Sequence, residues 1–411
     1  MKNIVVIGAG ASGLMAAVCA KEKYGNSANV TVIEKNERPA RKLMITGKGR
    51  CNVTNNCNLD ELIANTPRNP RFLYSAFSAF SSADTMAFFE KRSVPLKTER
   101  GNRVFPVSDK AVDIVDALVN SAKKSGVKFI KQTVTEILAL NGAVSAVLLS
   151  DGNEIPADSV IVATGGVSYP VTGSTGDGYK FAESLGHTVT EITPSLVPIE
   201  CHEGFCSKLS GLSLKNVKFS VFEEGKKKPL FSEMGEMLFT HFGISGPLVL
   251  SASAHIKNIN AKKHKGVIDL KPALTVEQLD SRILRDFGEQ LNKDFINSLD
   301  KLLPKSLIPV IVKLSGINEH TKVNSIDRES RRKFAELIKN FPLTLTKFRP
   351  VEEAIITRGG VAVKEINPTT MESKLIGGLF FAGEVIDVDS YTGGFNLQIA
   401  FSTGYVAGNN V

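Results

Sequence analysis

The chain has 411 residues, of which 42% are hydrophobic and 22% charged, a composition that excludes a mostly disordered or fibrous protein. Fifty Lys and Arg residues against 42 Asp and Glu give a net charge of +8, which we expect to be spread along the chain and to suit phosphate-bearing ligands. The five Cys residues are an odd number in a long chain, which argues against a disulfide framework and predicts a reducing, cytoplasmic location.

The N-terminal segment has the order of a dinucleotide-binding unit. Residues 3–7 form a β-branched apolar run, the sequence GAGASG follows, residues 14–23 indicate an Ala-rich helix, and residues 29–33 form a second run that ends in an acid. In this order the glycines and the helix N-terminus bind a pyrophosphate. The acid binds a ribose but repels a 2′-phosphate, which favours FAD or NAD over NADP. The residues predicted to hold the cofactor here are Gly8, Gly10, Ala11, Ser12, Gly13 and Glu34.

The same N-terminal stretch, residues 4–20, is apolar enough to resemble the core of a signal peptide. Its ordered glycines and the strand-like run that follows favour the nucleotide-binding interpretation instead. No window of about 18 clean apolar residues occurs, so we expect no membrane span.

A basic, glycine-rich stretch follows the second strand. It includes the sequence TGKGRCN at residues 46–52, which is typical of a loop that wraps a long anionic cofactor, although a solvated basic loop has the same composition. Cofactor contacts in this stretch are predicted for Lys35, Arg41, Lys42, Gly49, Arg50, Cys51 and Asn52.

Several further elements are expected before residue 170. The pattern predicts helices over residues 70–91 and 111–125, and a hairpin turn at Asp151-Gly152. A buried strand at residues 159–163 runs into Thr-Gly-Gly, which fits a second crossing of the chain beside the phosphates of an FAD. The other predicted strands cover residues 128–130, 134–140 and 144–150, and further cofactor contacts are predicted at Val134, Thr164, Gly165 and Gly166.

The C-terminal stretch carries the strongest cofactor signal. Residues 378–384 form a strand that ends in glycine and a carboxylate, and such a carboxylate can bind ribityl hydroxyls. A Gly-Gly pair then opens the last helix, which extends to about residue 406, and its N-terminal dipole can stabilise the negative charge that gathers on a reduced flavin. The predicted cofactor residues are Gly383, Glu384, Asp387, Gly393, Gly394, Phe395, Asn396 and Leu397.

These motifs predict an α/β protein with a Rossmann-like FAD-binding domain built from both chain ends. We expect residues 1–190 and 350–411 to form this discontinuous domain. Short strands predict a small β-barrel over residues 191–272, and helical patterns with proline breaks predict a helical subdomain over residues 273–349. The two inserted parts are expected to cover the flavin and to form the substrate pocket.

The chain resembles the bacterial flavoproteins known as BaiN-type or aminoacetone-oxidase-type FAD-dependent oxidoreductases. The resemblance implies a two-dinucleotide-binding flavoprotein fold, FAD and redox chemistry, and ATGG with GSTGDGY is more distantly similar to fumarate-reductase-type flavoproteins. Glu384 stands where many such proteins have Asp, and Ser390 stands where this family's loop is expected to have Gly. The matching stretches include VVIGAGASGLMAA, RKLMITGKGRCNVTN, GNRVFPVSDKA, LFTHFGISGP, TRGGVAVKEINPTTMESK and GLFFAGEVIDVDSYTGGFNLQIAFSTG.

Three side chains are candidates for the chemistry around the flavin. His241 and Tyr391 are candidate proton donors, although a structural His is an equal alternative. Arg358 precedes a Gly-Gly pair that the resemblance places near the flavin, where it would hold an anionic substrate or form a salt bridge. The Cys spacings do not favour a disulfide reductase, and the absence of CxxC and HExxH patterns predicts no metal site.

The sequence therefore predicts a cytoplasmic FAD-dependent oxidoreductase that transfers hydride between flavin N5 and a small organic substrate. The reaction stays open between reduction of an activated double bond and oxidation of a small amine or ketone. Only one complete GxGxxG unit is present, so NADH or NADPH would act as a transient electron donor. The Lys runs at residues 226–228 and 262–265 indicate a solvated hairpin tip, so nucleic acid is not the expected partner. The alternatives are a flavoprotein acting on RNA and a non-catalytic flavin redox sensor; the oligomeric state has no signature in the sequence.

Overall fold

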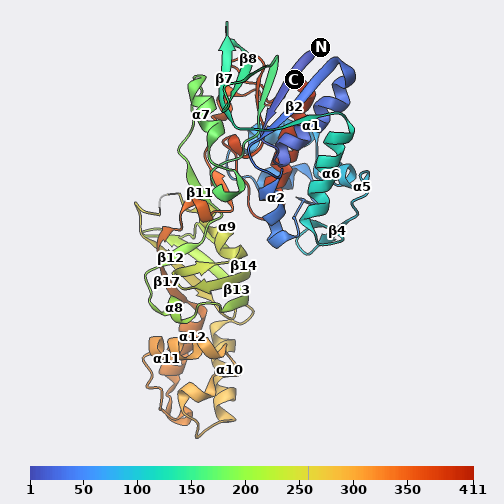
Figure 1. The fold of residues 1–411 in the computed structure, drawn as a ribbon. Coiled ribbons are helices and arrows are strands. Elements are labelled where there is room, and N and C mark those ends of the chain that lie inside the picture. Colours follow the sequence, from blue (N-terminus) through green and yellow to red (C-terminus); the bar gives the residue numbers. More distant parts are fainter. Residues whose placement is uncertain (258) are drawn as a thin grey trace. The chain divides into compact units, whose positions relative to one another are not determined.

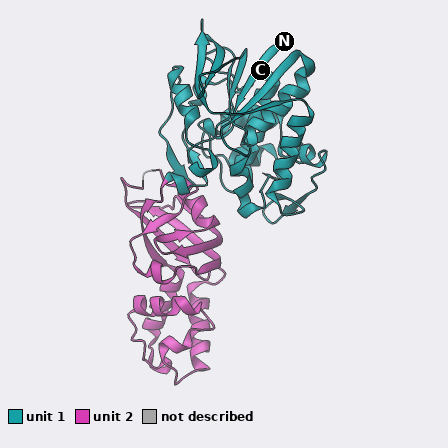
Figure 2. Ribbon diagram, in the orientation of Figure 1, with its two compact units in different colours: residues 1–195, 351–411 teal, residues 196–350 magenta. Residues whose placement is uncertain are grey.

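The computed structural model describes residues 1–257 and 259–411, and the chain divides into two compact units (Figures 1 and 2). Unit 1 comprises Met1–Ser195 and Val351–Val411, and unit 2 comprises Leu196–Pro350. The chain thus leaves unit 1 once and returns to it, so that both termini belong to the same unit. No helix among the described residues is long and apolar enough to cross a membrane.

Unit 1 is built on a five-stranded parallel sheet in the order β19-β10-β1-β2-β6. Its central strands are apolar runs with both faces covered, as expected of a parallel sheet. The strands are β1 (Lys2–Ile7), β2 (Ala28–Glu34), β6 (Lys128–Lys131), β10 (Ser159–Val162) and β19 (Leu379–Phe381). The predicted Rossmann-like sheet, with strands from both chain ends, is confirmed.

The first and last helices of unit 1 pack closely on each other, because small residues line their crossing. A Cβ atom at Gly404 would lie 2.4 Å from the carbonyl oxygen of Ser12, and one at Gly408 would lie 2.3 Å from that of Ala16. The helices are α1 (Ala11–Tyr24) and α13 (Phe395–Asn410), and α6 (Ala111–Lys124) also packs on α1. This contact joins the two ends of the chain beside the sheet.

The remaining elements of unit 1 are short. The predicted helix over residues 70–91 is interrupted, because Phe80 is extended and Ser81 starts a new helix with a capping box. The helices are α2 (Arg41–Ile45), α3 (Leu59–Ala64), α4 (Tyr74–Ala79), α5 (Ser82–Glu90) and α7 (Asp177–Ser184). The strands are β3 (Thr54–Asn55), β4 (Leu96–Glu99), β5 (Arg103–Pro106), β7 (Val134–Leu140), β8 (Ala143–Leu149), β9 (Glu154–Pro156), β11 (Thr193–Ser195) and β18 (Ile356–Arg358).

Unit 2 contains a closed antiparallel barrel in the order β12-β15-β14-β13-β16-β17, which confirms the predicted inserted barrel. Its strands are β12 (Ile199–Cys201), β13 (Ser213–Glu223), β14 (Phe231–Thr240), β15 (Gly243–Ser245), β16 (His264–Asp269) and β17 (Phe341–Phe348). The last strand comes after the helical part of the unit, within the range that the sequence pattern assigned to helices. It belongs to the barrel because its side chains alternate between buried and exposed positions.

The helical part of unit 2 lies between β16 and β17 in the sequence. Thr275 begins one helix with a capping box, and the Asp327 side chain caps another by accepting from the Ser330 N–H. The helices of the unit are α8 (Phe205–Lys208), α9 (Pro247–His255), α10 (Val276–Gly288), α11 (Ile308–Ser315) and α12 (Arg328–Lys339). Their apolar faces join the barrel interior in one core that includes Phe295, Phe334 and Phe341.

Candidate cofactor site

The segments predicted to bind the cofactor meet at the carboxyl edge of the parallel sheet. Gly8 follows β1, Glu34 ends β2, Thr164 follows β10 and Gly383 follows β19. Because these strands are parallel, their carboxyl ends share one edge. The chain turns to opposite sides of β1 here, since β1 lies between β2 and β10. Such a switch point is where open α/β sheets bind their ligands.

The three glycines of the GxGxxG turn differ in whether the packing around them excludes a side chain. A Cβ at Gly8, where φ is +100°, would lie 2.7 Å from the Ala163 carbonyl oxygen, and one at Gly13 would lie 1.9 Å from that of Gly8. At Gly10, by contrast, φ is −81° and the nearest atom to a Cβ would be 4.0 Å away. The protein's own packing therefore requires Gly8 and Gly13 but not Gly10. The open space above Gly10 fits a pyrophosphate that approaches the backbone.

The N-terminus of α1 and the acid at the end of β2 complete this cradle. No side chain among the described residues caps α1, and its first turn holds no acidic residue. Its free N–H groups and dipole therefore suit a phosphate. The Glu34 carboxylate accepts hydrogen bonds of 2.8 Å from the backbone N–H groups of Ala9 and Asn36, which fixes it beside the glycine turn. These residues fit the adenosine and pyrophosphate parts of an FAD.

The predicted basic loop divides into residues that face the site and residues held elsewhere. Lys42 donates to Glu384 at 2.7 Å and to Ser168 at 2.6 Å, so it reaches the carboxylate that follows β19. Arg50 instead pairs with Glu99 and Asp109, and its guanidinium lies 4.2 Å from the centre of the Phe105 ring. The other two basic residues contact the surroundings of Glu34 and α7, since Arg41 donates to Asn36 and Lys35 pairs with Asp177.

The remaining residues predicted on this side differ in their accessibility. Cys51 is fully buried, and burial raises the pKa of its thiol to about 12, so it is protonated and unreactive near neutral pH. Asn52 has a buried Oδ1 with no hydrogen-bond partner among the described residues. Gly49 has φ of +83° and open space at its Cβ position. Val134 is buried at the start of β7, two residues after Gln132, whose N–H donates to the Glu34 carbonyl.

The glycines after β10 pack against residues of the C-terminal segment. A Cβ at Gly166 would lie 2.3 Å from Thr357 Oγ1 and 2.8 Å from Glu384 Oε1. Thr164 has a buried hydroxyl without a partner in the described structure, and Gly165 has φ of +75°. This turn therefore approaches the predicted ribityl-binding carboxylate closely.

The carboxylate of Glu384 is fixed by three donors. It accepts from Lys42, from the Ser168 hydroxyl at 3.1 Å and from the Thr357 N–H at 2.9 Å. Gly383 before it has φ of +78°, and a Cβ there would lie 2.5 Å from Ser12 Oγ. The longer side chain of Glu, compared with the expected Asp, is thus accommodated by a defined hydrogen-bond set.

The loop before α13 is held by its own polar side chains. Asn396 accepts from the Ser390 N–H at 2.8 Å and donates to the Ser390 carbonyl at 2.7 Å. Ser390 is not among the residues with positive φ, so the loop does not require glycine there. Gly394 has φ of +101° and its Cβ would lie 2.3 Å from the Thr54 backbone. The chain then enters α13 with Phe395 buried and Leu397 half-buried, and no side chain of the described structure caps this helix.

A buried polar cluster beside this loop was not predicted from the sequence. Asp389 is fully buried, its Oδ2 accepts from the Ser195 hydroxyl at 2.8 Å, and its Oδ1 has no hydrogen-bond partner among the described residues. Burial raises the pKa of this carboxyl above its usual range, against the opposing effect of Arg358 at 3.9 Å. Its neighbour Asp387 is bound by two hydrogen bonds from Arg68. No local sequence pattern predicts these contacts, because Ser195 lies 194 residues from Asp389 and Arg68 lies 319 residues from Asp387.

The structure places the three candidate chemical residues in different units. Arg358 ends β18 in unit 1 beside Asp389, and Tyr391 lies two residues beyond Asp389, where its N–H donates to the Asn65 carbonyl. His241 lies in unit 2, exposed at the turn between β14 and β15, with its ring 5.0 Å from that of Phe242. Arg358 and Tyr391 thus share a unit with the cofactor segments, and His241 does not.

Comparison with known proteins gives concordant results. The HI0933-like protein Rossmann domain family matches residues 2–410. The 3-dehydro-bile acid delta(4,6)-reductase of Clostridium scindens is 32% identical over 414 residues, covering 99% of this chain and 98% of its own. The ribosomal RNA dihydrouridine synthase of Haemophilus influenzae is 31% identical and covers 98% and 96% of the two chains.

A solved structure supports the same fold. The 3-ketosteroid delta1-dehydrogenase of Sterolibacterium denitrificans is 12% identical, with a TM-score of 0.55 over 100% of this chain and 99% of that one. The comparisons confirm the predicted resemblance and the Rossmann-like fold. The reductase relative confirms the assignment as an oxidoreductase. The chain belongs to the HI0933-like Rossmann family.

Proposed function

We propose that the chain binds FAD along the carboxyl edge of the parallel sheet. The observation that carries this proposal is Gly10, where an added Cβ would lie no closer than 4.0 Å to any described atom of the protein. In this arrangement the α1 N-terminus holds the pyrophosphate, Glu34 the adenosine ribose and Glu384 the ribityl chain. The N-terminus of α13 supports the pyrimidine edge of the flavin, where negative charge gathers on reduction.

We further propose that the reaction is the reduction of a carbon–carbon double bond conjugated with a carbonyl. One relative is named for reducing the delta(4,6) system of a 3-dehydro-bile acid, and another for making dihydrouridine, which is uridine with its ring double bond reduced. Both names describe adding a hydride and a proton across such a bond. A bound, reduced FAD supplies the hydride, and NADH or NADPH is the proposed electron donor.

The residues of this chain then have to bind the carbonyl and deliver the proton. Arg358 is the proposed carbonyl-binding cation, and Asp389 positions it from a buried site 3.9 Å away. Tyr391 and His241 are the proposed proton donors. His241→Ala should leave the flavin spectrum intact, and turnover unchanged with every working substrate would make His241 structural.

The reaction proposal is tested with anaerobically reduced protein and a matched pair of ketones. A cyclic enone should reoxidise the flavin and leave as a product two hydrogens heavier by mass spectrometry. The saturated ketone with the same skeleton should leave the flavin reduced. Reoxidation by both ketones, or by oxygen alone among all acceptors tried, would contradict the proposal.

A second candidate substrate is a uracil base within RNA. The prediction that the net charge is spread along the chain is wrong. Unit 2 carries 25 Lys and Arg against 17 Asp and Glu, which gives +8, whereas unit 1 carries 25 of each and is neutral. A domain that concentrates positive charge in this way suits a polyanion better than a small neutral enone.

A further inference from the structure

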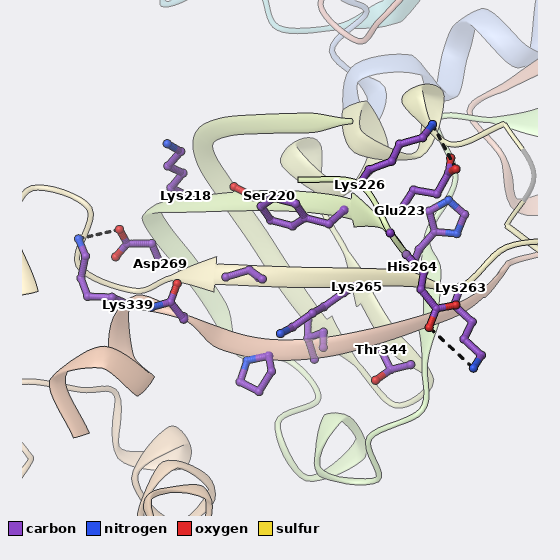
Figure 3. Close-up of a pocket in the computed structure, with 17 residues that line it drawn as sticks. Lys218, Ser220, Glu223, Lys226, Lys263, His264, Lys265, Asp269, Lys339 and Thr344 are labelled. Carbon is purple, nitrogen blue, oxygen red and sulfur yellow. Dashed lines mark ion pairs between the residues drawn. The ribbon is translucent and has the colours of Figure 1, made fainter. Parts of the chain in front are cut away.

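Three strands of the unit 2 barrel form an open groove on its outer face. Figure 3 shows this groove over β13, β16 and β17, and its volume is about 710 Å³. The lining belongs to one unit, so the groove is complete within it. Its residues include Lys218, Ser220, Phe222, Lys265, Val267, Pro342 and Thr344.

The strand register places these side chains in rows across the outer face. On β13 the buried positions alternate with Lys218, Ser220 and Phe222, so these three point away from the barrel core. Ser220 pairs with Val267, which pairs with Pro342, and this forms a middle row of one hydroxyl and two apolar side chains. In the next row Phe222 pairs with Lys265, which pairs with Thr344. An aromatic ring, an amine and a hydroxyl thus lie side by side.

Most charges around the groove are already compensated. Glu223 pairs with Lys226 and Lys262, Glu224 pairs with Lys263, and Lys339 pairs with Asp269 at 2.7 Å. Three lysines of the two Lys runs are therefore paired with carboxylates beside the groove.

Two cations of the groove differ from the rest. Lys218 and Lys265 have no ion pair in the part of the chain that the structure describes, and both are exposed. They lie on neighbouring strands, Lys218 opposite Asp269 and Lys265 opposite Phe222. The two pairs lie four positions apart along β13, which is a path of roughly 13 Å. The groove therefore offers two uncompensated amines along one line, with an aromatic ring beside the second.

We propose that this groove binds a single-stranded segment of RNA. The two free amines bind successive parts of the phosphate backbone, Phe222 stacks against an unpaired base, and the hydroxyls of Ser220 and Thr344 bind sugar or base edges. Charged grooves with an aromatic platform are the general means of binding single strands, and their bases must be unpaired to stack. This inference rests on the proposed function with a uracil base in RNA as the substrate. The groove would then hold the part of the RNA that lies outside the flavin site.

The test compares binding of a labelled, unstructured RNA 12-mer to the flavin-loaded full chain at several salt concentrations. Lys218→Gln/Lys265→Gln should bind more weakly, and the slope of log affinity against log salt should become shallower by about 1.4, since two phosphate contacts are lost. Phe222→Leu should weaken binding roughly tenfold or more, while Phe222→Tyr keeps the stacking and should bind like the wild type. The control Lys305→Gln/Lys313→Gln removes two exposed lysines of the same unit outside the groove and should change neither quantity.

The outcomes separate this inference from the proposed function. Equal salt slopes for the groove variant, the control and the wild type would overturn the groove, as would absence of RNA binding or preferential binding to vesicles of anionic lipid. Flavin reduction and enone turnover, measured on the same variants, should stay at wild-type level. If the protein binds RNA at the groove in a salt-dependent way but reduces no double bond, the RNA-binding inference is supported and the proposed reaction is contradicted.

Discussion

The two units of this protein use different physical means to prepare a binding site. Unit 1 has no net charge. Its candidate site consists of glycine turns, carboxylates fixed by backbone donors, and two helix N-termini that no described side chain caps. Unit 2 carries the entire net charge of +8. One face of its barrel presents Lys218 and Lys265, which form no ion pair with any described residue. The cofactor is expected where close backbone approach matters, and a polyanionic partner where charge matters. Variants of each unit can break or sharpen this contrast.

The largest expected effect is on folding, at Gly13, where the packing of the GxGxxG turn leaves no room for a side chain. Gly13→Ala places a Cβ 1.9 Å from the Gly8 carbonyl oxygen, so α1 must move away from β1. We expect destabilisation by more than about 3 kcal/mol, or no soluble protein. Denaturant unfolding measures the change. A variant with wild-type stability would mean that the turn is not packed as described.

The neighbouring glycine should separate folding from cofactor binding. Gly10→Val has an ordinary φ of −81° and open space in the protein, so its free energy of unfolding should stay within about 1 kcal/mol of the wild type, measured without cofactor. The new side chain occupies the pyrophosphate position, so the contacts between the turn and the pyrophosphate are lost. If these contacts contribute about 3 kcal/mol to binding, FAD affinity should fall at least roughly 100-fold. Gly204→Val, at a unit 2 position with a φ of −63° and open space around its Cβ position, is the control for a β-branched residue in place of glycine. Normal flavin content in the Gly10 variant would exclude this turn as the cofactor site.

A smaller effect is expected at the predicted ribityl-binding carboxylate. Glu384→Gln keeps the shape of the side chain but removes the charge that pairs with Lys42. FAD affinity should fall by about tenfold, corresponding to one weakened charge-assisted hydrogen bond. Glu136→Gln, an exposed position on β7, is the matched control and should bind FAD normally. Equal affinities in an equilibrium flavin-binding assay would remove Glu384 from the site.

The smallest expected effect is a pH dependence of stability from Asp389. Burial raises its pKa in the folded state, so the native protein keeps this proton to a higher pH than the unfolded chain does. Its contribution to stability therefore falls as pH rises from the ordinary Asp value of about 3.9 through the raised pKa. Asp389→Asn cannot titrate, so its stability relative to the wild type should increase over this window. A difference that stays constant or decreases with pH would contradict the raised pKa.

The sequence sufficed for much of the fold and for the outline of the site. The GxGxxG turn, the acid after β2 and the Gly-Glu pair after β19 are local patterns tied to strand ends, and parallel strands bring such ends together. The cluster of Asp389, Ser195 and Arg358 could not be predicted, because its members come from separate loops and only tertiary packing joins them. The closure of the barrel by β17 could not be predicted either, because a long helical segment separates β17 from its partner β16 in the sequence.

The groove was also beyond prediction from the sequence, because pairing between strands decides which lysines stay uncompensated. The sequence pattern singles out only the basic runs at residues 226–228 and 262–265, the second of which includes His264. Glu223 and Glu224 pair with Lys226, Lys262 and Lys263. Lys265 of the second run and Lys218 outside both runs have no ion pair among the described residues.

The central claim, an FAD site at the carboxyl edge of the parallel sheet that serves redox chemistry, is tested most directly by an anaerobic absorbance titration of the purified protein. The account predicts a flavin spectrum that NADH or NADPH bleaches, as dithionite does. Absence of bound flavin after attempted reconstitution with FAD would contradict it.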